Sequence, residues 1–112
     1  MLDYFFAYGQ FRDSNHELLE NATFCDKAFV YGRIYEVSKF YPGYIRESCD
    51  NVVWGDVYLV DSNIIPKLDE FEGDEYTREK IFTSIGEYCW IYVYKYDVSK
   101  FKEVERGDWI LR

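Results

Sequence analysis

The sequence has few of the residues from which metal sites and nucleophile sites are built. Its 112 residues include one histidine, His16, which excludes a metal site with several histidine ligands. The three cysteines, Cys25, Cys49 and Cys89, form no CxxC or CxxH pair, so neither a structural zinc site nor a disulfide framework is predicted. No GxSxG, P-loop or GxGxxG motif occurs. A pair between His16 and one cysteine stays open as an alternative, and we expect neither a metal nor a cofactor.

Long apolar runs and an excess of positive charge are also missing. The N-terminal stretch MLDYFFAYG is short and has no basic region, and no run approaches the ~20 residues of a membrane span. The net charge of −8 repels phosphate backbones and anionic lipids, so neither nucleic acid nor membrane is an expected partner. Three unpaired thiols fit a reducing compartment, and we expect a cytoplasmic protein.

What the sequence does contain is aromatic residues in a short chain. Its length fits a single domain over residues 1–112, with no repeat and no linker rich in Pro, Gly or Ser. Aromatic residues make up 21%, and such flat, bulky side chains favour strands. Strands are predicted at 3–8, 23–37, 52–60, 76–85 and 88–98.

Glycine and proline mark the breaks in this pattern. Gly32 predicts a bend in the second strand, and Gly55 predicts a bulge or a close backbone approach in the third. The segment 40–45 holds a Pro-Gly turn, and Gly86 with Glu87 predicts the turn of a hairpin. In the tail, the apolar pair of residues 109–110 is expected to dock on the body.

One segment changes to helical spacing. Asp61 or Ser62 can cap a helix whose buried face carries Leu68 and Phe71, and Gly73 stands where a helix C-terminal glycine belongs. A shorter helical turn is expected at 16–19, capped by Ser14 or Asn15. Several strands with few helices predict an α+β fold, in the form of a strongly curved sheet or a small mixed β-barrel with flanking short helices.

Glu72 lies at the end of the predicted helix, at the border of its buried face. Desolvation by aromatic neighbours and the negative end of the helix dipole would both raise its pKa, which makes it a candidate general base near neutral pH. The alternative is a solvated acidic helix end. The other acidic residues of this segment are more easily placed in solvent: Asp69, Glu70, Asp74 and Glu75.

A second candidate is the sequence FAYGQFR, where a buried strand stops at Gly9 and enters a polar turn. Such a turn exposes backbone N–H groups, which can bind a carboxylate or stabilise an oxyanion. The alternative is an ordinary strand exit.

Together these segments resemble the γ-glutamylcyclotransferase superfamily, and within it the small branch of γ-glutamylamine cyclotransferase and AIG2-like proteins. Five family motifs occur in order along nearly the whole chain. They are matched by Tyr8, Gly9, Gln10, Phe11, Arg12, Asn15 and His16; Tyr41, Pro42 and Gly43; Val53, Gly55, Asp56 and Tyr58; Leu68, Asp69, Glu72, Gly73, Tyr76 and Arg78; and Trp90, Tyr92 and Tyr94. The closing sequence Gly-Asp-Trp at 107–109 also looks like the end of some members.

The resemblance implies a compact mixed β-barrel with a pocket at one side. It implies Glu72 as the acid/base catalyst and a substrate loop formed by Tyr8, Gly9, Gln10 and Phe11. It also implies a pocket-lining hydroxyl from Tyr76 and a reaction that needs no cofactor. In that reaction the α-amine of a γ-glutamyl compound attacks its own γ-amide, which yields 5-oxoproline and a free amine.

Three positions depart from the family pattern. Position 10 is Gln rather than Ser or Thr, position 11 is Phe rather than Leu, and Asp13 replaces a frequent Gly. These changes in the substrate loop keep a second hypothesis open, a binding or sensing protein on the same fold with little or no turnover. A third hypothesis is a protein-interaction module with an aromatic surface. The expected partner is a small γ-glutamyl substrate, and the expected state is a monomer or a weak homodimer.

Overall fold

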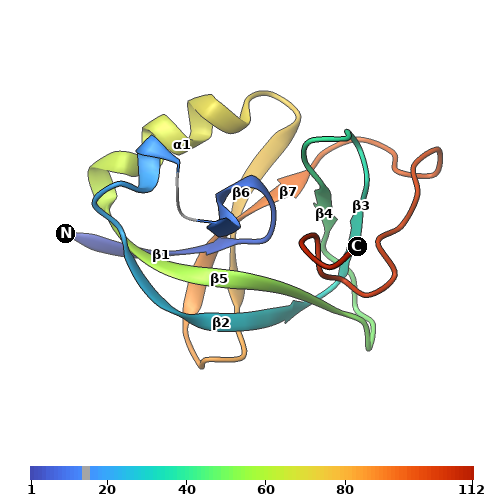
Figure 1. Ribbon diagram of the computed structural model, residues 1–112, viewed down its shortest axis with the longest axis horizontal. Coiled ribbons are helices and arrows are strands. Elements are labelled where there is room, and N and C mark those ends of the chain that lie inside the picture. The colour runs from blue at the N-terminus through green and yellow to red at the C-terminus, as the bar shows by residue number, and fades with distance from the viewer. Residues whose placement is uncertain (14–15) are drawn as a thin grey trace.

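The computed structural model describes residues 1–13 and 16–112, and it shows a strongly curved sheet with one α-helix packed against it (Figure 1). The sheet has seven strands, in the order β2-β5-β1-β7-β4-β3 with β6 on β7. The strands are β1 (Leu2–Ala7), β2 (Thr23–Tyr31), β3 (Arg33–Tyr35), β4 (Gly43–Ile45), β5 (Val52–Asp61), β6 (Tyr76–Phe82) and β7 (Tyr88–Tyr94). The helices are α1 (Ile65–Glu72) and three short 3-10 helices, η1 (Gln10–Asp13), η2 (Glu17–Leu19) and η3 (Ser62–Ile64). The predicted α+β class is confirmed.

The prediction of a closed barrel is wrong, because the sheet stays open. The two ends of the strand order, β2 and β3, follow each other in the chain across Gly32, but no ladder joins them among the described residues. Gly32 has a φ of 144°, so the chain bends there as predicted and carries β3 away from the edge of β2. A ring of Tyr44 fills the space beside this glycine, and a Cβ at position 32 would lie 2.5 Å from it.

Strand β7 is the element on which the architecture depends. One of its two edges pairs with β6 over the full length of both strands. The other edge is divided: β1 pairs in parallel at Trp90, and β4 pairs in parallel at Val93. The chain of β1 therefore leaves β7 at the point where β4 arrives, and the segment that follows β1 starts at this division.

Two apolar cores lie on the two faces of β1, as the alternation of its side chains dictates. Phe6 belongs to the core formed with β2, β5 and the C-terminal tail, and Phe5 belongs to the core under α1. Strand β5 pairs with both β1 and β2, and Gly55 lets them approach, since a Cβ there would lie 2.5 Å from the carbonyl oxygen of Ala7. The close approach predicted at Gly55 is confirmed, whereas the register shift of this ladder lies between Phe24 and Asp26.

The helix segment agrees with the prediction except at its start and at one side chain. The α-helix begins only after η3, and Ile64 precedes it without a side-chain capping hydrogen bond. The side chain of Asp61 caps η3 by accepting a hydrogen bond from the N–H of Asn63, and α1 ends at Gly73, whose φ is 77°. Leu68 is fully buried as predicted, but Phe71 is 43% exposed. Phe71 packs its ring against the loop after β1 rather than against the sheet, because it lies at the outer border of the last helical turn.

Smaller predictions have mixed outcomes. The helical turn at 16–19 is present as η2, but its cap is His16, whose Nδ1 accepts a hydrogen bond from Leu18; Ser14 and Asn15 lie outside the described residues. The hairpin turn at 86–87 is confirmed, and in the tail Trp109 is buried while Ile110 is half exposed. No helix in the described ranges is long and apolar enough to cross a membrane.

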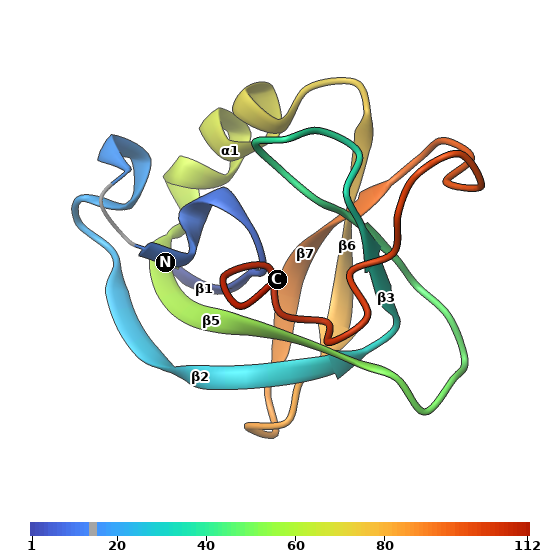
Figure 2. The same cartoon turned by 45° about the vertical axis from the view of Figure 1, so that its right-hand side comes forward.

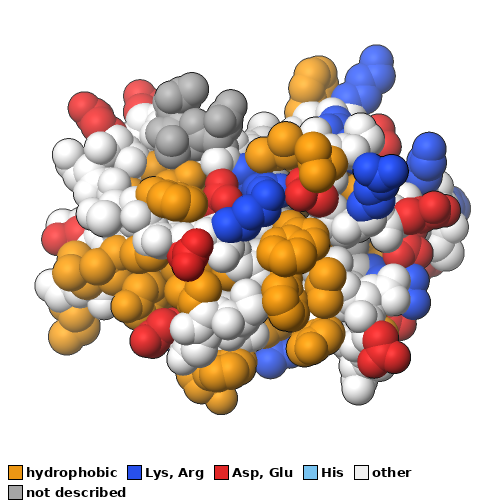
Figure 3. All heavy atoms as spheres, turned by 60° about the horizontal axis from the view of Figure 1, so that its bottom comes forward, with side chains coloured by type: hydrophobic (Ala, Val, Ile, Leu, Met, Phe, Trp, Pro, Cys, Tyr) orange, Lys and Arg blue, Asp and Glu red, His pale blue; other side chains and the backbone are white. Residues whose placement is uncertain are grey.

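The C-terminal segment runs beside β3 and ends near the loop after β1 (Figure 2). Its backbone pairs with β3 through Val104 and Ile34, and its Gly107 carbonyl accepts a hydrogen bond from Trp54 of β5. Hydrophobic side chains are also exposed in several groups on the face that Figure 3 shows. The exposed large aromatic side chains of the sheet are Phe24, Tyr31, Phe82 and Tyr88.

Candidate functional site

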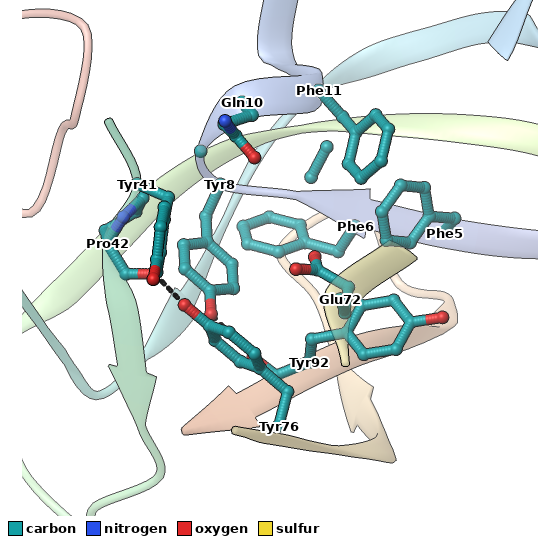
Figure 4. A pocket seen from close by; sticks show the side chains of 12 residues that line it. Phe5, Phe6, Tyr8, Gln10, Phe11, Tyr41, Pro42, Glu72, Tyr76 and Tyr92 are labelled. Atoms are coloured by element: carbon teal, nitrogen blue, oxygen red, sulfur yellow. Dashed lines mark hydrogen bonds between the residues drawn. The ribbon is translucent and has the colours of Figure 1, made fainter. Parts of the chain in front are cut away.

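A narrow pocket opens where the loop after β1 meets the end of α1 (Figure 4). Its walls come from β1, the following loop, the turn before β4, the last residue of α1 and the strands β6 and β7. The lining residues are Phe5, Phe6, Ala7, Tyr8, Gly9, Gln10, Phe11, Tyr41, Pro42, Glu72, Tyr76 and Tyr92. The inner cavity has a volume of about 20 Å³, and a wider hollow of about 250 Å³ adjoins it. Four residues line both spaces: Gln10, Tyr41, Glu72 and Tyr76.

Tyr8 is held at the division of the sheet. Its hydroxyl donates a hydrogen bond to the carbonyl oxygen of Tyr92 at 2.6 Å and accepts one from the backbone N–H of Tyr44 at 3.1 Å. These are backbone groups of β7 and β4, so the hydroxyl joins the two strands where β1 has left the ladder. Burial, followed by the charges of neighbouring groups that include Glu72, raises the pKa of Tyr8, so its phenol stays protonated.

The turn before β4 packs directly on the loop. A Cβ at Gly9 would lie 2.7 Å from Cδ of Pro42, so only a glycine lets the proline ring reach this position. The carbonyl oxygen of Pro42 accepts a hydrogen bond from the hydroxyl of Tyr76 at 2.8 Å (Figure 4). The hydroxyl of Tyr76 therefore fixes one wall of the pocket.

The loop itself is a single turn of 3-10 helix, η1. It is closed by a hydrogen bond from the N–H of Arg12 to the carbonyl oxygen of Gly9, 3.0 Å long. In such a turn the first N–H groups, here those of Gln10 and Phe11, are not used by the helix itself. The side chain of Phe11 is buried and packs edge-on against Phe5, so it contributes to the core under α1.

A buried ion pair anchors the other end of the loop. The guanidinium of Arg12 contacts Asp108 at 2.5 Å and Asp56 at 3.8 Å, and the Arg12 side chain is only 3% exposed. The carbonyl oxygen of Arg12 also accepts a hydrogen bond from the hydroxyl of Tyr58 at 3.2 Å. The C-terminal segment thus holds the far end of the loop in place.

Glu72 reaches the pocket because it lies one turn after Leu68 on the buried face of α1. Its carboxyl group points into the pocket toward the rings of Phe6 and Tyr8 (Figure 4). Burial raises the pKa of Glu72 to about 7, from an ordinary value of 4.5. The carboxyl group can therefore both accept and release a proton near neutral pH.

The phenols around Glu72 keep their protons at that pH. Burial is the first cause that raises the pKa of Tyr76 and of Tyr92, and the negative charge of Glu72 raises both further. Glu72 is thus a carboxyl group that titrates in the neutral range among hydroxyl groups that do not.

Asp69, the neighbouring carboxylate on α1, contacts β6 and β7. Asp69 accepts a hydrogen bond from the hydroxyl of Tyr92 at 2.8 Å and forms an ion pair with Arg78 at 2.8 Å. The guanidinium of Arg78 in turn lies over the ring of Trp90, 4.1 Å from its centre. This chain of contacts fixes α1 to β6 and β7, and so holds Glu72 in place.

The structure brings all six predicted site residues into this one pocket: Tyr8, Gly9, Gln10, Phe11, Glu72 and Tyr76. His16 lies against the rings of Phe11 and Phe71 instead of serving as half of a cysteine pair. In the described ranges no group of three or more His, Cys, Asp or Glu is placed to hold a metal ion.

Several residues that line the pocket have no predicted role in the site. Tyr41 and Pro42 match a family turn and Tyr92 matches a family strand, but these matches do not predict that the three residues line the pocket. For Phe5 and Tyr92 the sequence does hold a signal: the alternation of side chains along β1 and β7 places each on one face of its strand, and the two lie in the same core. The turn before β4 reaches the loop after β1 only because β4 pairs with the distant strand β7, and no local pattern in the sequence indicates this contact.

The family of the chain follows from its sequence over nearly its whole length. The family described as Gamma-glutamyl cyclotransferase, AIG2-like, matches residues 5–111. The chain belongs to this family. A relative from Escherichia coli strain K12, the gamma-glutamylcyclotransferase family protein YtfP, is 33% identical over 112 residues, which cover 96% of each chain.

Solved structures support the same fold for this γ-glutamylcyclotransferase family member. The solution structure of ytfP from Escherichia coli is similar with a TM-score of 0.75 and 31% identity, over 96% of both chains. An AIG2-like protein from Mus musculus is similar with a TM-score of 0.76 over 89% of this chain and 82% of that one. At 18% identity, the second likeness concerns the fold alone.

The raised pKa of Glu72 predicts how the stability of this family member depends on pH. Between about pH 4.5 and 7 the folded state binds more protons at Glu72 than the unfolded state, so the free energy of unfolding falls as the pH rises through this window. Replacing Glu72 with glutamine removes this contribution to the pH dependence of stability, because glutamine does not titrate. We expect urea unfolding to show that the free energy of unfolding of the variant, relative to that of the wild type, is higher at pH 8 than at pH 5 by on the order of 2 kcal/mol. An unchanged pH dependence would contradict the burial of the charge.

Proposed function

We propose that the protein is a γ-glutamyl cyclotransferase, which converts a γ-glutamyl amide into 5-oxoproline and a free amine. The observation that carries this proposal is the partly desolvated carboxyl group of Glu72, with a pKa of about 7, in one pocket with the loop Tyr8–Phe11. Membership in the family supports the reaction type.

In this proposal the nucleophile comes from the substrate. The α-amine attacks the γ-carbonyl carbon, a five-membered ring closes, and the amide C–N bond breaks. The pocket contributes by holding the bent conformer in which the two groups meet. Glu72 accepts the proton of the attacking amine and returns it to the leaving nitrogen, a task that suits a pKa near 7.

The loop is proposed to bind the glutamyl part through its backbone. The N–H groups of Gln10 and Phe11 are the groups proposed to stabilise the oxygen that becomes negative in the transition state. Recognition by backbone groups tolerates the departures at positions 10 and 11, because the amides stay while the side chains change.

The test is a panel of γ-glutamyl amines and γ-glutamyl dipeptides, incubated with the protein and assayed for 5-oxoproline. We expect at least one member of the panel to release 5-oxoproline in proportion to the protein concentration. The proposal is overturned if no compound of the panel is converted.

A binding protein on the same fold is the second candidate. The inner cavity of about 20 Å³ has room for little more than one water molecule, and the exposed side chain of Gln10 stands at its mouth, which favours slow or absent turnover. In that case γ-glutamyl compounds should raise the melting temperature without any release of 5-oxoproline.

A further inference from the structure

The wider hollow beside Glu72 is the space that a leaving group would occupy. It is lined by Gln10, Tyr41, Phe71, Glu72, Glu75 and Tyr76, and it continues into the inner cavity. With the glutamyl part of a substrate against the loop and its amide at Glu72, this adjoining hollow is the space into which the leaving group would extend. This inference rests on the proposed function, since that function places the amide at Glu72.

A second carboxylate is held inside this hollow. The hydroxyl of Tyr41 donates a hydrogen bond to Oε1 of Glu75 at 3.1 Å, and Glu75 is partly buried. Burial and then the Glu75 carboxylate raise the pKa of Tyr41, which keeps the phenol protonated as the donor. Glu75 is thus an oriented acceptor in the wall of the hollow.

The other walls also suit a positive charge. The rings of Tyr41 and Tyr76 stand edge to face with their centres 6.4 Å apart, and aromatic faces attract ammonium groups. None of the described residues that line the inner cavity or the hollow is a lysine or an arginine. A leaving group with a free carboxylate would therefore meet two carboxylates and no cation to balance it.

We propose that the substrate is the mono-γ-glutamyl amide of a diamine, whose distal ammonium group binds Glu75. The chemistry is unchanged: the bond from the α-amine nitrogen to the γ-carbon forms, and the bond from that carbon to the diamine nitrogen breaks. The proton of the α-amine moves through Glu72 to the leaving nitrogen, and the products are 5-oxoproline and the free diamine. Glu75 and Tyr41 set the specificity without taking part in the proton transfer.

Three substrates of equal reach test this proposal. They are the γ-glutamyl amides of 1,4-diaminobutane, of pentylamine and of 5-aminopentanoate, whose distal groups are an ammonium, a methyl and a carboxylate. We expect kcat/KM to be at least about tenfold higher for the ammonium compound than for the methyl compound, because one hydrogen bond to a charged group is worth about that factor. The carboxylate compound should be the poorest of the three.

The variants locate the effect at Glu75. Glu75→Gln should lower kcat/KM for the ammonium compound by about tenfold and leave the methyl compound within about twofold. Tyr41→Phe, which removes the hydrogen bond that orients Glu75, should reduce the same preference by a smaller factor. Glu70→Gln, on the exposed side of α1, is the matched control and should leave kcat/KM for both compounds unchanged.

The outcomes separate this inference from the proposed function. Equal turnover of all three compounds, or an equal loss for both uncharged and charged compounds in Glu75→Gln, overturns the diamine proposal and leaves the cyclotransferase in place. If none of the compounds is converted, calorimetry of the same three compounds with the wild type tests whether Glu75 recognises the ammonium group. Tighter binding of the ammonium compound that is lost in Glu75→Gln supports the recognition site, and equal or absent binding overturns it.

Discussion

Glu72→Gln is expected to lower the rate of 5-oxoproline formation by about 10²- to 10⁴-fold, the range that a positioned acid/base group contributes. Glutamine keeps the size of the side chain but can neither take the proton of the attacking amine nor return it to the leaving nitrogen. The loss should appear mainly in kcat, because the substitution leaves untouched the loop that is proposed to bind the glutamyl part. Steady-state assays with the best compound of the panel measure both constants.

The pH dependence of the same reaction identifies the group. The kcat/KM of the wild type should rise through about pH 7 as Glu72 ionises in the free protein, and Glu72→Gln should lack this limb. Glu70→Gln serves as the control, since Glu70 lies on the exposed side of α1. A Glu72→Gln variant that retains full activity, with its circular dichroism unchanged, would exclude Glu72 as the proton carrier.

Asp108→Ala is expected to cause the largest loss of stability, about 3 kcal/mol. The change removes the closer partner of the Arg12 guanidinium, whose side chain is 3% exposed, and leaves Asp56 at 3.8 Å as its one ion-pair partner among the described residues. A buried charge without its partner keeps the cost of desolvation and loses the attraction that offset it. Urea unfolding should show a lower midpoint, and the melting temperature should fall by more than about 10 °C.

A more exposed ion pair provides the control for that measurement. Glu103 contacts Arg33 at 2.9 Å, but the two side chains are 26% and 31% exposed, so Glu103→Gln should cost no more than about 1 kcal/mol. The double variant Arg12→Met, Asp108→Ala should be more stable than Asp108→Ala alone, since it removes the stranded charge as well. If the single and the double variant are equally stable, the unpaired charge of Arg12 is not the cause of the loss of stability.

The elements with local signals were predictable from the sequence. Helix α1 has its apolar spacing and the terminal Gly73, and Asp61 caps the short helix η3 that leads into it; from these local signals the position of Glu72 at the border of the buried face followed. The bend at Gly32 and the hairpin turn at Gly86 are equally local. Phe71 was placed wrongly, because in a helix of eight residues the period does not distinguish a side chain on the sheet from one on a neighbouring loop.

The parts that failed or were missed depend on contacts between distant segments. Whether a curved sheet closes is decided by the pairing of its last strands, and here Gly32 turns the chain before β2 and β3 can pair. The contact of Arg12 with Asp108 joins residues that are 96 positions apart. The hydroxyl of Tyr8 between β4 and β7 is likewise a product of the assembled sheet. The resemblance identified Tyr8 as part of the loop, but not the backbone groups it joins.

One edge of β7 is shared by β1 and β4, and this arrangement is similar to the switch point of an open α/β sheet. There, neighbouring parallel strands lead their chains apart, and the crevice beyond their carboxyl ends is where ligands bind. Here β1 runs parallel to β7, departs from it after Ala7, and opens the crevice at Gly9. The location of the pocket is thus a property of strand connectivity. Gln10 and Phe11 can therefore depart from the family pattern without the protein losing the pocket.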